Sequence, residues 1–185
     1  MRLNVERCLE RCIVRAAIIA LIFFISASVS HGFELTSRYA TLVYEREDLL
    51  RTFNKEISLG SLSYLMRNMR SITSDDEIRN KMDVLVERVE VVLDMYPKDA
   101  KVRIVLLSSD TEVQKVYKAR YNRNVDFISF YAPKEKTIYV SVSDVRLGVL
   151  AHELAHMIID HYFGVSPPVK IHEVLAQFVE KNLKD

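Results

Sequence analysis

The sequence predicts an α+β domain, and three observations lead to this fold class. Hydrophobic residues make up 49% of the 185 residues and charged residues 28%, so the chain can bury a core and is not disordered. From residue 74 onward, helical and strand-like periods follow each other in the order α-β-α-β-β-α-α, which is typical of α+β proteins. The two consecutive strands in this order are joined by a short turn, which predicts an antiparallel hairpin.

The first thirty residues have the pattern of a targeting segment. Four arginines outweigh two glutamates, residues 16–29 carry no charge, and small residues end the run. This order is typical of a signal peptide, and the apolar run is shorter than the ~20 residues of a membrane-spanning helix. We therefore expect an exported protein, periplasmic or extracellular. A retained membrane anchor at residues 16–29 is the first alternative, and a buried N-terminal core helix is the second.

Charge and cysteine content exclude some classes of partner. The net charge is +1 for the whole chain and −1 (+1 − 4 + 2) without residues 1–30, which gives no electrostatic case for binding nucleic acid. Both cysteines, Cys8 and Cys12, lie in the targeting segment. The exported part then has no disulfide and no thiolate metal ligand.

Residues 31–73 are expected to form a helical N-terminal extension, separate from a domain at residues 74–185. Apolar residues at helical spacing predict one helix over residues 37–54. Gly60 marks a break, and a second short helix follows around residues 62–69.

The domain is expected to begin with the most regular helix of the chain. Ser74 to Glu77 reads as a capping box, the apolar stripe continues to Tyr96, and Pro97 ends the helix. The stripe is expected to pack on a sheet, with a coiled-coil seam as the alternative.

The middle of the domain contains the expected strands. Residues 101–107 form the first, and a capping box at Ser109 to Glu112 then opens a helix. Residues 127–131 and 137–142 form the two strands of the hairpin.

Two helices are expected to end the chain. Ser143 can cap the first, and Gly164 ends it in the position that favours glycine. Ser166 can cap the second, with Pro167 at its first position, and this helix runs to about Leu183.

The first of these helices contains the motif H-E-x-x-H. His152 and His156 lie one turn apart on the same face, so two neutral imidazoles can hold one Zn²⁺. Glu153 lies beside them and can accept a proton from a metal-activated water. The flanking residues are apolar, which predicts a buried helix in which a glutamate needs a specific role. The alternative is a surface helix with two incidental histidines.

A third ligand must come from outside the motif, because a catalytic zinc usually has three protein ligands. His161 points roughly 140° and 180° away from His156 and His152 on a regular helix, so it is set aside as an ordinary histidine. Glu173 follows a tight helix–helix connection, which makes the two helices antiparallel and brings it level with His156. The alternative role for Glu173 is an acid that favours the N-terminal helix dipole.

The stretches T-I-Y-V-S-V-S-D, H-E-L-A-H and H-E-V-L-A-Q resemble the gluzincin branch of zinc metallopeptidases. The likeness covers roughly residues 100–185, and it is closest in size to the small, core-only gluzincins. It implies a zincin-like core, in which a small mixed sheet is followed by an active-site helix and one further helix. It also implies Glu173 as the third zinc ligand, and residues 137–142 as the edge strand along which a peptide or protein substrate lies.

The residues around the proposed zinc ligands depart from the pattern of this family. Many gluzincins have Asn before the third ligand and Asp four residues after it, and both orient the zinc histidines by hydrogen bonds. The matching positions here are His172 and Gln177, either of which can accept an N–H bond. Asp160, one turn past His156, is an alternative partner.

The sequence therefore predicts a zinc metallopeptidase with Glu153 as the general base. The alternative is a non-catalytic zincin-like module of the cell envelope that binds metal or a partner. Residues 31–73 could in addition act as a prosegment that covers the cleft.

Overall fold

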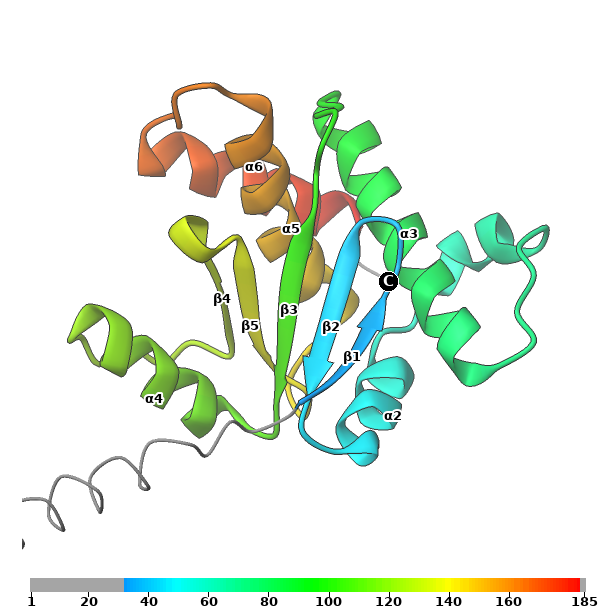
Figure 1. Cartoon of the computed structure of the whole chain (residues 1–185). Coiled ribbons are helices and arrows are strands. Elements are labelled where there is room, and N and C mark those ends of the chain that lie inside the picture. Colours follow the sequence, from blue (N-terminus) through cyan, green and yellow to red (C-terminus); the bar gives the residue numbers. More distant parts are fainter. Residues whose placement is uncertain (1–31, 184–185) are drawn as a thin grey trace, which may run out of the picture. The chain divides into compact units, whose positions relative to one another are not determined.

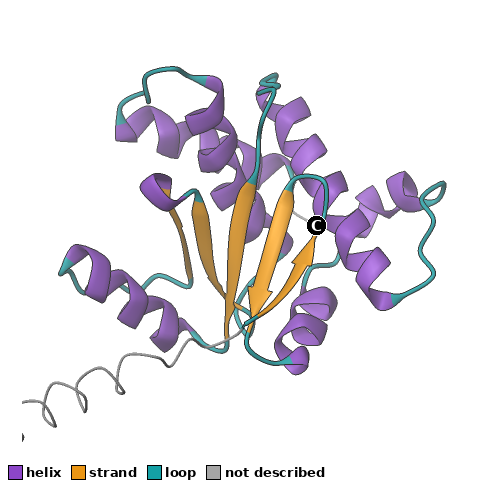
Figure 2. Ribbon diagram, viewed as in Figure 1, coloured by secondary structure: helices purple, strands orange, loops and turns teal. Residues whose placement is uncertain are grey.

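The centre of the fold is a five-stranded mixed sheet (Figure 1, Figure 2). Its strand order is β1-β2-β3-β5-β4, with β2, β3 and β5 parallel and an antiparallel strand at each edge. The computed structural model describes residues 32–183. The strands are β1 (Phe33–Thr36), β2 (Ala40–Tyr44), β3 (Val102–Leu107), β4 (Ser129–Ala132) and β5 (Thr137–Ser141).

Five α-helices and two short 3₁₀ helices surround the sheet within residues 32–183. No helix in that range is long and apolar enough to cross a membrane. The predicted targeting segment at residues 1–30, with both cysteines, lies outside the described residues. The helices are α2 (Glu47–Glu56), η1 (Gly60–Met66), α3 (Ser74–Leu93), α4 (Asp110–Tyr121), η2 (Pro133–Glu135), α5 (Leu147–Tyr162) and α6 (Val169–Asn182).

The sheet separates two hydrophobic clusters because side chains alternate between its faces. In β3, Ile104 and Leu106 enter the larger cluster, which also takes buried residues from α2, α3, α5 and α6. Val105 and Leu107 face the smaller cluster under α4. The metal-binding motif predicted on α5 therefore lies on the side of the sheet that carries most of the core.

The structure confirms the α+β class, with a mixed sheet followed by helices, and the β4–β5 hairpin. In this hairpin, η2 makes the turn and Lys136 adopts a left-handed conformation with φ of 47°. The assignment of the core as zincin-like stays a prediction.

The helix predicted over residues 37–54 is wrong. Residues 40–44 form β2, with Ala40, Leu42 and Tyr44 buried and the residues between them half-buried, and α2 begins only at Glu47. Leucines and valines at this spacing fit a helix as well as a strand, so the pattern alone was ambiguous. Because β1 and β2 pair with the rest of the sheet, residues 31–73 are not a purely helical extension. The hypothesis of a prosegment rested on residues 31–73 being an addition to the domain, and this basis is lost because their strands belong to its sheet.

Helix ends differ from the predictions by one to three residues. Thr73 caps α3, since its side chain accepts from the Asp76 N–H while the Asp76 carboxylate accepts from the Thr73 N–H. The caps predicted at Ser143 and Ser166 are wrong, because α5 and α6 begin after Arg146 and Pro168.

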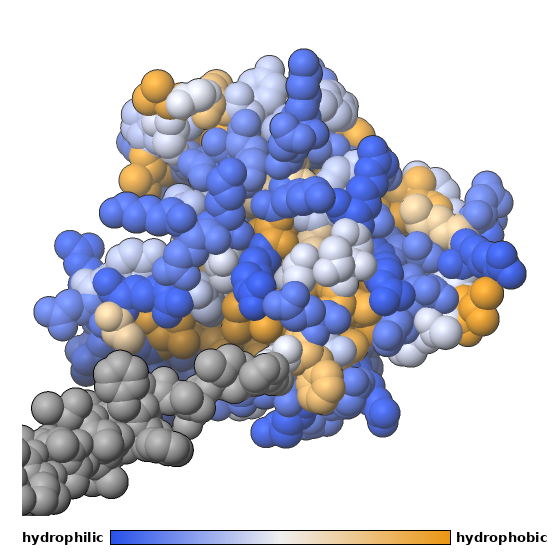
Figure 3. All heavy atoms as spheres, viewed as in Figure 1, coloured by the Kyte–Doolittle hydropathy of each residue, from blue (hydrophilic) through white to orange (hydrophobic). Residues whose placement is uncertain are grey.

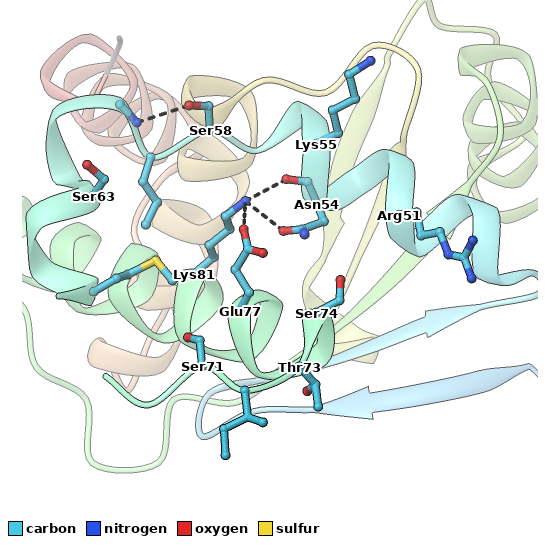
Figure 4. A pocket seen from close by; sticks show the side chains of 14 residues that line it. Arg51, Asn54, Lys55, Ser58, Ser63, Ser71, Thr73, Ser74, Glu77 and Lys81 are labelled. Atoms are coloured by element: carbon cyan, nitrogen blue, oxygen red, sulfur yellow. Dashed lines mark hydrogen bonds and ion pairs between the residues drawn. The ribbon is translucent and has the colours of Figure 1, made fainter. Parts of the chain in front are cut away.

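A partly buried ammonium group joins α2 to α3. Lys81 Nζ donates to the carbonyl oxygen and the Oδ1 of Asn54, both at 2.8 Å, and lies 2.9 Å from Glu77 Oε1. These three side chains line a hollow of about 1010 Å³ between α2, η1 and α3 (Figure 4). All three ammonium protons have an acceptor, so Lys81 acts as a structural tie between the two helices.

Candidate metal centre

Helix α5 brings the two motif histidines together. Their Nε2 atoms are 3.2 Å apart, as expected for residues one turn apart on one face. Leu150, Leu154 and Ile158 are fully buried on the same helix. The prediction of a buried, apolar helix is therefore confirmed, and the alternative of a surface helix is excluded.

Helix α6 supplies a carboxylate to the same point. The connection from Phe163 to Pro168 reverses the chain, so α6 packs beside α5 (Figure 1). Glu173 Oε1 lies 3.5 Å from His156 Nε2, and Glu173 Oε2 lies 3.6 Å from His152 Nε2. His152, His156 and Glu173 thus form one cluster of potential metal ligands, as predicted.

The spacing of these atoms matches a tetrahedral metal site. Ligand atoms about 2.1 Å from a tetrahedral ion lie about 3.4 Å from each other. Here the two Nε2 atoms are 3.2 Å apart, and each lies 3.5 or 3.6 Å from a different carboxylate oxygen of Glu173. With one ligand atom taken from each residue, the three atoms lie within 4.8 Å of one another. Two imidazoles and one carboxylate suit Zn²⁺, and the same set also suits other divalent transition metals. The residues present therefore fit a metal ion of this class.

A second carboxylate of α6 lies behind His152. The Nδ1 of His152 is buried and makes no hydrogen bond of good geometry within residues 32–183, but Glu180 Oε2 lies 3.3 Å from it. Glu180 was not among the predicted residues. Its signal in the sequence is its spacing, because seven residues after Glu173 is two turns on the same helix face. A carboxylate at this place can hold the ring of a metal-ligating histidine in position.

His172 lies behind His156, as predicted. The Nδ1 atoms of the two rings are 3.5 Å apart, and the rings stack with centroids 5.6 Å apart. On its other side, His172 Nε2 is 2.9 Å from Ser166 Oγ. If His156 uses Nε2 for a metal, its Nδ1–H can donate to His172, whose Nε2–H can donate to Ser166. This chain would fix the tautomers of both rings.

The other two residues predicted to support the ligands lie elsewhere. Gln177 is exposed on α6. Asp160 Oδ2 accepts from the hydroxyl of Tyr131 at 3.2 Å. In residues 32–183 neither has a hydrogen bond to His152 or His156, so their predicted role gains no support from geometry. His161 is also apart from the cluster, since its Nδ1 is 2.9 Å from the Met157 carbonyl oxygen in its own helix.

Glu153 is buried beside the cluster, between α5 and β4. Only 7% of its surface is exposed, and Ser129 Oγ donates to its Oε1 at 2.8 Å. Burial raises the pKa of Glu153, while the Ser129 hydrogen bond and the neighbouring His152 oppose this rise. Sequence reasoning did not identify Ser129. A carboxyl group at this place lies next to the candidate ligands, where it could exchange protons with a water held by them.

The ligand His156 is neutral over a wide pH range. Burial lowers its pKa to about 4, and the neighbouring His152 and His172 add to this effect. A metal ion therefore does not have to displace a proton from this ring at neutral pH.

The prediction that residues 137–142 form an edge strand is wrong. Strand β5 pairs with β3 on one side and with β4 on the other, so it has no free backbone edge. The edge strand on the side of the cluster is β4, which carries Ser129 next to Glu153. A cavity of about 250 Å³ adjoins the cluster, lined by Tyr131, Pro133, His156, Ser166, Pro167, Val169, His172 and Glu173.

Comparisons with protein-family models, with curated proteins and with solved structures give no match for this chain. The likeness to gluzincins therefore rests on the motif residues and the geometry of the cluster.

Proposed function

We propose that this protein is a zinc-dependent metallopeptidase. The observation that carries the proposal is the convergence of His152, His156 and Glu173, whose ligand atoms lie within 4.8 Å of one another, with the buried carboxylate of Glu153 beside them. A site that only stored or bound a metal would need the three ligands. It would not need a buried glutamate next to them, whose burial costs stability.

The chemistry divides between the metal and Glu153. A bound Zn²⁺ would polarise the substrate carbonyl and make water acidic enough to lose a proton near neutral pH. Glu153 would accept that proton, because its buried carboxylate lies beside the ligands. Glu153 then passes the proton to the amine that leaves. Ser129, hydrogen-bonded to Glu153 Oε1, holds the carboxylate in place.

We propose that the substrate lies along β4. Its outer backbone groups have no partner strand within residues 32–183, so an extended peptide can pair with it by strand addition. The cavity next to His156 and Glu173 can then receive a side chain of that peptide. Export of the protein, with residues 1–30 as its signal, is part of the same proposal.

The test combines metal content with hydrolysis. Purified protein is assayed for bound zinc and for cleavage of casein and of a mixed peptide pool, with and without a chelator. Glu153→Gln should retain zinc and lose hydrolysis by at least ~100-fold. Glu45→Gln, at an exposed position, is the matched control and should behave as the wild type. Stoichiometric zinc with no cleavage in the wild type would instead favour a non-catalytic metal-binding module.

A further inference from the structure

Helix α6 exposes a stripe of large apolar side chains. Ile171, Val174 and Phe178 are 47%, 57% and 51% exposed, and their spacing of three and four residues places them on one face. The opposite face is buried through Ala176 and Val179. The helix therefore has two apolar faces, and only one of them packs on the protein.

Exposed apolar residues are also frequent in the end of α5 and the connection before α6. Fourteen large hydrophobic residues are exposed among residues 32–183, and half of them fall within residues 162–178. Single exposed apolar residues are ordinary, but a concentration of this kind marks an interaction surface. Hydrophobic residues reach the surface over this part of the molecule at the upper left of Figure 3. These residues are Tyr162, Phe163, Val165, Val169, Ile171, Val174 and Phe178. The last three share one face of α6 and are here named the α6 apolar surface.

The acidic and the basic residues of α6 lie on different faces of the helix. Both acidic residues, Glu173 and Glu180, turn toward the histidines of the metal cluster. The charged residues exposed on the outer side are Lys170 and Lys181, which flank the apolar stripe. An apolar stripe bordered by lysines is typical of helices that lie in the interface of an anionic lipid bilayer.

We propose that the α6 apolar surface binds an anionic membrane surface, with α6 lying parallel to the bilayer plane. A second copy of the chain fits this surface less well. A two-fold dimer places the same patch on both sides of the interface, so Lys170 and Lys181 of one copy would approach those of the other. Anionic headgroups are attracted to these same lysines, while the apolar side chains enter the boundary of the acyl chains.

This inference does not depend on the peptidase activity. If both proposals hold, the metal cluster lies within about one helix diameter, ~10 Å, of the lipid surface, because Glu173 is on the same helix. Protein segments close to the membrane would then be the accessible substrates.

The chain contains no tryptophan, so a single introduced tryptophan can report on one place. The variant Phe178→Trp is compared with Tyr64→Trp, whose native residue is 53% exposed on η1. The full chain is mixed with vesicles of phosphatidylcholine and phosphatidylglycerol, with or without brominated acyl chains. Residues 16–29 could bind vesicles by themselves. The tryptophan at position 178 responds only when its own surroundings enter the lipid, so it distinguishes insertion of α6 from binding through residues 16–29. We expect at least twofold quenching and a blue shift for the Phe178→Trp variant, and neither for the Tyr64→Trp control.

Equal quenching in both variants, or none in Phe178→Trp, would overturn the proposal. A blue shift in Phe178→Trp that rises with protein concentration without vesicles would show self-association and would also overturn it. A second variant tests the charges: Lys170→Gln with Lys181→Gln, in the Phe178→Trp chain, should weaken binding to phosphatidylglycerol vesicles by about fivefold per lysine. Unchanged binding in that variant would contradict the role of the lysines. Circular dichroism confirms that each variant is folded.

Discussion

Replacing His156 should remove an acid-dependent loss of stability from the metal-free protein. Burial lowers the pKa of His156 to about 4, whereas an unfolded histidine titrates near 6.5. Between these pH values the unfolded chain binds a proton that the folded protein excludes. Stability is therefore lost as the pH falls below about 6.5, and the loss is complete below about 4. At about 1.4 kcal/mol per pH unit, the full loss from this one side chain is about 3.5 kcal/mol, of which about 3 kcal/mol is lost between pH 7 and 4.

The assay is urea unfolding of chelator-treated protein at several pH values between 7 and 4, for the wild type and for His156→Gln. Groups distant from His156 also titrate in this range, and their contributions cancel in the difference between the two proteins. The wild type should lose about 3 kcal/mol more than the variant over this range. His161→Gln, at a histidine outside the cluster, should keep the wild-type pH dependence. Parallel curves for the wild type and His156→Gln would refute the reasoning.

Three further substitutions test other contacts. Glu180→Gln should weaken zinc binding ~10–100-fold in competition with a chelator, whereas unchanged affinity would show that Glu180 does not support His152. Leu154→Ala removes a fully buried side chain and should lower the free energy of unfolding by about 3 kcal/mol, while Val174→Ala at an exposed site should change it by less than ~0.5 kcal/mol. Lys81→Met leaves the acceptors of α2 and α3 unpaired and should cost ~1–3 kcal/mol in thermal or urea unfolding; no loss would mean that the tie is not stabilising.

The motif helix was predictable because local and tertiary requirements agree there. Residues 149–159 are apolar nearly throughout, so burial, helical spacing and the placement of His152 and His156 lead to the same structure. The short connection predicted that the two last helices pack side by side, but it left Glu173 either as a ligand or as an acid at the helix N-terminus. The resemblance to gluzincins decided for the ligand.

Strand order and the first two strands depended on contacts that the sequence pattern does not reveal. The placement of β5 between β3 and β4 is set by long-range pairing, so residues 137–142 could be recognised as a strand but not as an internal one. The apolar residues at 40–44 fit the spacing of a helix and of a strand equally well. The strand forms because it buries Ala40, Leu42 and Tyr44 on one face of the sheet. Glu180 was not predicted, because the residues expected to support the ligands were chosen by their match to the gluzincin pattern. The seven-residue spacing that places Glu180 on the same helix face as Glu173 was not considered.

Helix caps were the least predictable feature. Ser143 has the right residue type, but its hydroxyl hydrogen-bonds to the side chain of Asp144, and α5 begins only after Arg146. Several serines and threonines near a helix start can each satisfy the capping pattern, and the packing of the connection selects among them.

The central claim is that His152, His156 and Glu173 hold one divalent metal ion. Crystals grown with zinc and measured at the zinc absorption edge test it directly. The account predicts one anomalous peak about 2.0–2.2 Å from Nε2 of both histidines and from a carboxylate oxygen of Glu173. A peak that lacks Glu173 among its ligands, or no peak at the two histidines, would contradict it.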